Sequence, residues 1–176
     1  TGVHKGLPYV KICRVSDFDI RKIFDCGQCF RFDPVEKFGN KIEVGGVAFG
    51  KYVIFAQNHE NELMIYGSTE KEYNSIWRKY LSLDTDYDKV NAQILSCTDS
   101  LHMKMAIEYG NGIRILRQDP YEAIISFIIS QNNNIPRIKG IVEKLCALCG
   151  DEITFLDKTY YALDGAGKLG GEYEWT

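Results

Sequence analysis

Residues 114–150 constrain the fold of this chain most strongly, because two apolar segments there flank the polar run QNNN at residues 131–134. Residues 119–122 read DPYE, which places an N-cap Asp, a first-turn Pro and a capping-box Glu in the order that begins a helix. The apolar run that follows predicts a helix over residues 120–130 that is buried on every side. Apolar residues then recur at helical spacing as far as Gly150, which predicts a second helix.

The three asparagines between these helices supply more amide donors and acceptors than the connection needs. A single left-handed or N-capping residue is enough to join two helices. We expect Asn134 to be used mainly as a helix cap. The surplus at residues 132 and 133, with Arg137 one turn further on, indicates a surface that hydrogen-bonds something outside the protein.

The composition bounds the class of protein. The 176 residues are enough for one sizeable core or two small ones. A net charge of −3 argues mildly against nucleic acid, but the acidic residues are concentrated in residues 151–176, so the charge decides nothing. We find no signal-like segment and no apolar run of membrane-spanning length, and therefore expect a cytoplasmic protein of bacterial type, associated with the nucleoid, with no membrane partner.

The six cysteines raise the question of a metal. Residues 26–29 and 146–149 each have the CxxC spacing of half a zinc site. More than a hundred residues separate the halves, far from the compact spacing of zinc ribbons, so we expect no metal and no cofactor. Cys13 and Cys97 are expected to be free, buried thiols. The DTDYD run at residues 84–88 is expected to cap a helix, because residues needed for a calcium loop are missing after it.

The first half of the chain predicts an antiparallel sheet, and the second half predicts helices. Glycines at 45 and 46 stand inside an expected strand, which suggests a bulge or a close backbone approach. The organisation predicted is an α+β sheet domain over 1–85, a partial helical domain over 86–162 and a divergent, disordered tail over 163–176. Strands are expected at 9–14, 28–32, 41–49, 52–57 and 63–66, and helices at 18–24 (capped by Asp17), 70–81, 87–96 and 100–109.

Three motifs occur in order: CGQCFRF at residues 26–32, LRQDP at 116–120 and NNNIPRI at 132–138. Together they resemble the 8-oxoguanine DNA glycosylase family of the helix-hairpin-helix superfamily, and the resemblance covers about residues 8–150. It implies an N-terminal antiparallel sheet domain, similar to the TATA-binding protein, followed by the start of an all-α helix-hairpin-helix glycosylase domain, here truncated. It also implies a monomeric repair enzyme, a glycosylase and β-elimination lyase, that removes 8-oxoguanine opposite cytosine in duplex DNA.

The resemblance assigns roles to individual residues. The two purines differ at N7, which is an acceptor in guanine and an N–H donor in 8-oxoguanine, so one fixed carbonyl separates them. The resemblance gives that carbonyl to Gly27. For Phe30 core packing is the default expectation, and a wall of the lesion pocket is the alternative role. Asn132 would fill the hole left by the flipped base, Arg137 would bind the acceptors of the orphaned cytosine, and Asn133 would brace the hairpin between them.

The catalytic lysine and aspartate of the family lie beyond the stretch that this chain matches. Residues 163–168, LDGAGK, resemble the family's hairpin only faintly, and Lys168 is not assigned as the nucleophile. We therefore expect no catalytic residue here and an inactive fragment. The alternatives are a non-catalytic module that binds damaged duplex DNA, a structural metal or redox domain built on the CxxC pairs, and a glycosylase for alkylated purines.

Overall fold

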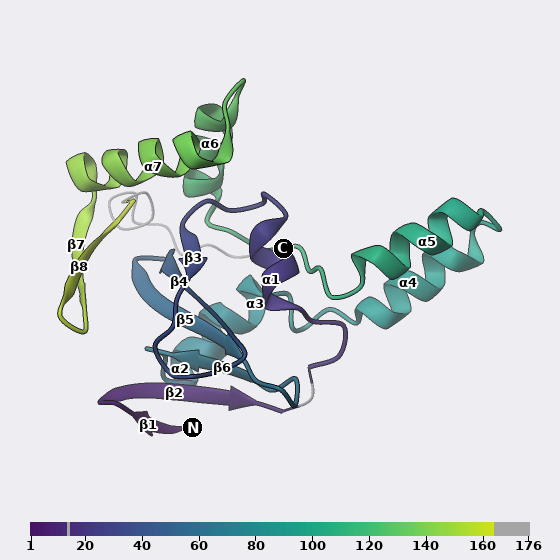
Figure 1. Ribbon diagram of the computed structural model, residues 1–176, viewed down its shortest axis with the longest axis horizontal. Helices are drawn as coiled ribbons and strands as arrows, with labels where there is room; N and C mark the ends of the chain where they lie inside the picture. The colour runs from purple at the N-terminus through teal and green to yellow at the C-terminus, as the bar shows by residue number, and fades with distance from the viewer. Residues whose placement is uncertain (14, 164–176) are drawn as a thin grey trace. The chain divides into compact units, whose positions relative to one another are not determined.

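The computed structural model, drawn in Figure 1, describes residues 1–13 and 15–163. It has the predicted α+β fold, with an antiparallel sheet in the order β1-β2-β6-β5-β4-β3 and a separate hairpin of β7 and β8. The strands are β1 Gly2–His4, β2 Leu7–Ile12, β3 Phe32–Pro34, β4 Ile42–Ala48, β5 Lys51–Gln57, β6 Leu63–Tyr66, β7 Asp151–Phe155 and β8 Lys158–Ala162. The helices are α1 Ile20–Asp25, α2 Glu70–Glu72, a π-helical turn Tyr73–Trp77, α3 Arg78–Tyr80, α4 Tyr87–Ser96, α5 Leu101–Gly110, α6 Pro120–Ser130 and α7 Ile135–Cys149.

The chain forms two compact units, each made of several segments. The first contains residues 1–28, 34–44 and 54–117, and the second contains residues 29–33, 45–53 and the chain from 118 onward. These units do not test the predicted domain boundary near residue 85, which stays a prediction. From residue 164 onward, the tail predicted over 163–176 and its LDGAGK motif lie outside the described residues.

The core of the first unit lies along β5, which reads KYVIFAQ. Its residues Ile54, Phe55 and Ala56 are almost wholly buried, as expected of a central strand with both faces covered. Phe55 stacks on Phe24 with ring centroids 5.6 Å apart and meets Trp77 edge to face at the same separation. These aromatic contacts hold α1 and the π-helical turn to the sheet.

The start of α1 corrects a prediction. The helix was expected over 18–24 with Asp17 as its cap, but it begins at Ile20, and the Asp19 side chain accepts hydrogen bonds from the N–H groups of Arg21 and Lys22. Asp17 has a φ of +46°, outside the helical region, and its carboxylate accepts from the N–H of Gly112 instead. The hydrogen bond from Gly112 holds Asp17 outside the helix, and α1 therefore begins later than its local sequence predicts.

Other differences are local. The strand expected over 28–32 forms only at β3, because the preceding residues make a turn. Cys13 and Cys97 are free but exposed rather than buried. Asp86 caps α4 by accepting from the N–H of Lys89 at 3.1 Å, as expected.

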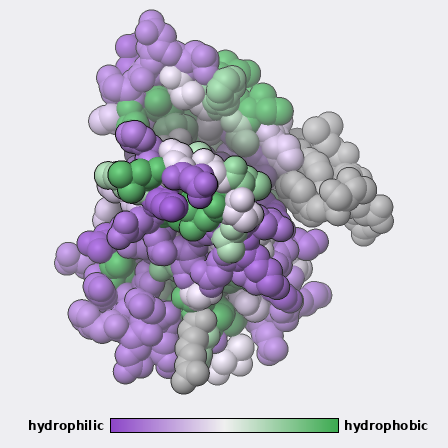
Figure 2. Space-filling model, turned by 90° about the vertical axis from the view of Figure 1, so that its right-hand side faces the viewer, coloured by the Kyte–Doolittle hydropathy of each residue, from purple (hydrophilic) through white to green (hydrophobic). Residues whose placement is uncertain are grey.

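In the second unit, α6 is not buried on every side. Ile124, Phe127 and Ile128 are 58%, 67% and 61% exposed, and Ser126 is the buried residue of the helix. The described residues cover only one side of this helix, and an apolar run does not say which neighbours will cover it. Figure 2 shows one face of the molecule, on which hydrophobic residues form separate patches among hydrophilic ones.

Candidate nucleic-acid interface

Gly27 stands in the turn that follows α1, in the first unit. Its φ of +79° lies in the left-handed region that glycine adopts without strain. Chain neighbours aside, none of the described atoms lies within 4 Å of the position that a Cβ would take. The backbone at Gly27 is thus exposed and open to close approach.

Gln28, which sequence reasoning did not select, fixes this turn. Its Nε2 donates to the carbonyls of Ile23 and Arg114 at 3.0 and 2.9 Å. Its Oε1 accepts from the N–H of Leu116 at 2.8 Å. The signal available in the sequence was an amide, able to donate and accept at once, directly after the turn glycine.

The Asn-rich hairpin in the second unit divides its polar groups between internal and external use. Asn133 donates to the carbonyl of Ile129 at 3.1 Å and accepts from the N–H of Asn134 at 3.0 Å, so it braces the hairpin. Asn134 caps α7 by accepting from the N–H of Arg137 at 3.1 Å.

The other two polar side chains of the hairpin are uncommitted. Asn132 is exposed, with a left-handed φ of +51°, and Arg137 is exposed in the first turn of α7. Within the described parts of the chain, neither the Asn132 amide nor the Arg137 guanidinium makes a hydrogen bond or ion pair. A cation in the first turn of a helix is mildly unfavourable by itself. This pair is therefore the part of the hairpin that is free to bind a partner.

Phe30 belongs to the core of the second unit. It is partly buried and packs against the cluster of Ile138, Val142 and Cys146 on α7. This contact shows the core-packing role, and its role as a wall of a lesion pocket stays a prediction. The structure places Phe30 in the same unit as the hairpin, whereas Gly27 belongs to the other unit.

An ion network centred on the buried side chain of Arg31 was not predicted. The side chain of Arg31 is 2% exposed, and its Nη1 lies 3.9 Å from a carboxylate oxygen of Glu122 on α6. Its Nε donates to Glu143 on α7 at 3.2 Å, and its Nη2 donates to the carbonyl of Tyr161 on β8. Arg31 therefore joins the two hairpin helices to β8.

Glu122 is the strongly perturbed member of this network. Its burial raises the pKa to about 7, and the nearby Arg31 opposes this shift. The carboxyl is thus only partly ionised near neutral pH, since burial disfavours the charged form. Because its side chain faces Arg31, this group acts in the helix packing rather than at the hairpin tip.

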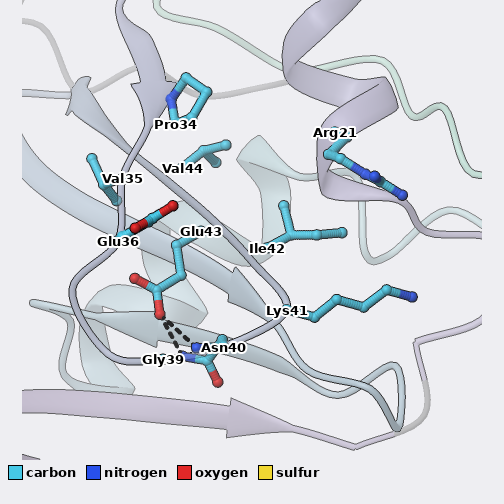
Figure 3. Close-up of a pocket in the computed structure, with 10 residues that line it drawn as sticks. All are labelled: Arg21, Pro34, Val35, Glu36, Gly39, Asn40, Lys41, Ile42, Glu43 and Val44. Atoms are coloured by element: carbon cyan, nitrogen blue, oxygen red, sulfur yellow. Dashed lines mark hydrogen bonds between the residues drawn. The ribbon is translucent and has the colours of Figure 1, made fainter.

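A cavity of about 400 Å³ lies elsewhere in the first unit and contains none of the residues selected from the sequence. Figure 3 shows Glu43 at its wall, hydrogen-bonded to Asn40. The Glu43 carboxylate also accepts from the N–H groups of Lys37 and Phe38 at 2.6 and 3.0 Å. Although burial raises the pKa of Glu43, these hydrogen bonds bring it below its usual value. Glu43 therefore organises a loop.

Two other features bear on the alternatives. Of the two CxxC pairs, Cys26 and Cys149 are exposed while Cys29 and Cys146 are buried. Among residues 1–13 and 15–163, no group of three or more His, Cys, Asp or Glu side chains is arranged to hold a metal ion. No helix in these same ranges combines the length and hydrophobicity that a membrane crossing requires.

Comparison with known families decides where this chain belongs. Residues 11–124 match the family described as 8-oxoguanine DNA glycosylase, N-terminal domain. The chain belongs to the 8-oxoguanine DNA glycosylase family. An N-glycosylase/DNA lyase of Saccharomyces cerevisiae is 29% identical over 154 residues, which cover 83% of this chain and 40% of the yeast protein.

Solved structures of this family are similar in fold. The apo form of the Clostridium acetobutylicum 8-oxoguanine glycosylase/lyase has a TM-score of 0.81 and 35% identity, covering 94% of this chain and 55% of that one. The same enzyme in complex with double-stranded DNA containing cytosine opposite 8-oxoguanine has a TM-score of 0.78 and 36% identity, covering 89% and 52%. This chain thus spans about half the length of these relatives.

Proposed function

We propose that this chain recognises 8-oxoguanine opposite cytosine in duplex DNA, as the lesion-reading and strand-reading part of a DNA glycosylase/lyase. The observation that carries the proposal is the hairpin. The side chains of Asn133 and Asn134 form hydrogen bonds with the protein's own backbone. Asn132 and Arg137 stay exposed and unpaired within the described residues. Membership of the family and the similarity to an enzyme bound to such a duplex support it.

The chemistry of the estranged base suits this pair. Cytosine presents N3 and O2 as acceptors beside one amino donor. The Arg137 guanidinium offers only donors in a planar fork, so it satisfies those acceptors and leaves a base with a donor there unmatched. The Asn132 amide both donates and accepts, and it is short enough to fill the space that a flipped nucleotide leaves.

The lesion itself would be read by Gly27. In 8-oxoguanine N7 carries a hydrogen, which a backbone carbonyl accepts, whereas in guanine the carbonyl would face a lone pair. The open space around the Cβ position of Gly27 supports this role, because no side chain limits how closely a base can approach the backbone there.

A comparison of opposite bases tests this proposal. The affinity of the 176-residue chain is measured for duplexes with 8-oxoguanine opposite cytosine and opposite adenine, at one fixed salt concentration because phosphate contacts depend on salt. We expect tighter binding when cytosine is opposite. Equal affinity for both duplexes would contradict the role given to Arg137.

We further propose that these 176 residues bind without cutting. The reason is that the residues matching the family's motifs do not include the family's catalytic lysine, whose amine attacks C1′. Borohydride trapping on an 8-oxoguanine duplex should give no covalent adduct. A trapped adduct would overturn this part of the proposal and leave the binding roles intact.

A further inference from the structure

Gly27 has no side chain of its own that could fix the position of its backbone. Glycine has the greatest backbone freedom of any residue. Its side is open, because no described atom beyond its chain neighbours lies within 4 Å of the Cβ position. A carbonyl that separates two purines by one hydrogen bond must nevertheless be held to within about 0.5 Å. Another group therefore has to hold the Gly27 carbonyl in place.

The next residue does so. The Gln28 amide joins three backbone groups on two segments, one at Ile23 and one at residues 114–116, which lie 86 and 88 residues from Gln28 at Arg114 and Leu116. One end of the clamp is the carbonyl of Ile23 in α1, at 3.0 Å from Nε2. The other end is the segment 114–116, where the amide donates to the carbonyl of Arg114 at 2.9 Å and accepts from the N–H of Leu116 at 2.8 Å.

The segment that receives the clamp is itself rigidly held. Arg114 is 3% exposed and Leu116 is 5% exposed. The guanidinium of Arg114 donates at 2.7 to 3.1 Å to the carbonyls of Ser16, Asp17, Ser82 and Thr85. Gln28 therefore ties the turn to a fixed part of the first unit.

We propose that Gln28 is a positioning residue that orients the Gly27 carbonyl and thereby sets the selectivity for 8-oxoguanine over guanine. The inference rests on the proposed function of Gly27 as the lesion reader. It assigns Gln28 no contact with the DNA, so its loss should change the ratio of the two affinities while leaving the affinity for undamaged duplex unchanged.

The test compares Gln28→Ala and Gln28→Glu with the unchanged chain on duplexes that hold 8-oxoguanine or guanine opposite cytosine. We expect the ratio of the two affinities to fall by about tenfold in both variants, the scale of one unmet hydrogen bond. Gln28→Glu keeps the size of the side chain and its acceptor for Leu116, but it cannot donate to the two carbonyls. If Gln28→Glu kept the same ratio of affinities as the unchanged chain, donation by the amide would not be needed, and the proposal would be overturned.

A second glutamine provides a matched control. Gln57 also bridges two backbone groups, since its Nε2 donates to the carbonyl of Phe18 at 2.9 Å and its Oε1 accepts from the N–H of Ile20 at 3.2 Å. It holds the opposite end of α1 from Gly27. Gln57→Ala should lower the melting temperature at least as much as Gln28→Ala, yet keep the ratio of affinities.

The outcomes separate the inference from the function beneath it. A lesion preference in the unchanged chain that Gln28→Ala retains would overturn the inference alone. No preference in the unchanged chain would overturn both. Hydrogen exchange at the Leu116 amide gives a readout without DNA: exchange should accelerate in Gln28→Ala, and an unchanged rate would show that the clamp does not form.

Discussion

At the scale of single residues, the two exposed groups of the hairpin matter because their neighbours are already occupied. Asn133 and Asn134 satisfy the backbone of residues 129, 134 and 137, which leaves Asn132 and Arg137 as the surplus. The surplus of amides was visible in the sequence. Which asparagine would be free was not, because that depends on which backbone groups of the turn lack partners.

Replacing Arg137 by Ala should weaken binding to an 8-oxoguanine duplex about tenfold when cytosine is opposite, because a fork of donors is lost. Binding to a duplex with adenine opposite should change less. Titration by fluorescence anisotropy measures both affinities. Lys144→Ala is the control, since Lys144 is exposed on nearly the same face of α7 two turns away. If the two variants behaved alike, Arg137 would act only as a positive charge.

Gly27→Ala should reduce the preference for 8-oxoguanine over guanine, because the added methyl group occupies the space that the purine edge needs. The left-handed φ of +79° should also lower stability by about 1–2 kcal/mol. Gly6 has a φ of +78° and open space around its Cβ position, so Gly6→Ala carries the same strain. Binding assays and urea unfolding should show equal losses of stability but a lost preference in Gly27→Ala alone. A retained preference would remove Gly27 from the site.

At the scale of elements, the expected close approach at the glycine pair in β4 is confirmed at Gly46. A Cβ on Gly46 would overlap the backbone carbonyl of Arg31 and come within 2.7 Å of the Phe32 ring. Gly46→Ala should therefore destabilise the protein by about 1–3 kcal/mol, as overpacked core substitutions do. Gly140→Ala, on a helix face with open space, should instead be neutral or stabilise by about 0.5–1 kcal/mol. Urea unfolding of both variants measures these changes. A small loss of stability in Gly46→Ala would mean that Arg31 and Phe32 can shift to make room for the added methyl group.

The Arg31 network predicts a pH dependence. The pKa of Glu122 is raised by burial to about 7 in the folded chain. The folded state therefore binds the proton more tightly than the unfolded state, whose carboxyl has a pKa of about 4.3. Stability contributed by the protonated group is present at low pH and is lost as the pH rises through about 7.

Glu122→Gln removes this titration and should be more stable than the unchanged chain at pH 8, by about 1–3 kcal/mol, with the advantage shrinking toward pH 5. Urea unfolding across this pH range measures the difference. Glu143→Gln, which removes the half-exposed partner of the same arginine, should cost under about 1 kcal/mol. A Glu122→Gln variant that was less stable at every pH would show that pairing with Arg31 outweighs the cost of burying the charge.

Local patterns predicted α4, β6, the caps at Asp119 and Asn134 and a cap within residues 84–88 correctly, because capping and periodicity are properties of neighbouring residues. The hairpin of β7 and β8 was missed. Its turn contains Leu156 with a φ of +51°, a conformation that leucine rarely adopts, so no Asn-Gly signal marked it. Tyr52, which stacks on Tyr160 with ring centroids 3.9 Å apart, lies more than a hundred residues away in the sequence.

At the scale of the whole molecule, the motifs predicted the family and the α+β fold, while the site could be predicted only in part. Gly27, Asn132 and Arg137 were assigned from motifs that can be read in order along the chain, and their roles stay predictions. Gln28 and Arg31 stand within the first motif, but their roles could not be read from it, because the hydrogen bonds that define those roles reach partners 86 and more residues away. Long-range partners of this kind are what a local pattern omits.

The measurement that tests the central claim most directly is equilibrium binding of the 176-residue chain to two duplexes at one salt concentration. One duplex holds 8-oxoguanine opposite cytosine, and the other holds guanine opposite cytosine at the same position. The roles of Gly27, Asn132 and Arg137 predict tighter binding to the lesion, by about tenfold or more. Equal affinity for both duplexes would contradict the claim that this chain reads the damaged base.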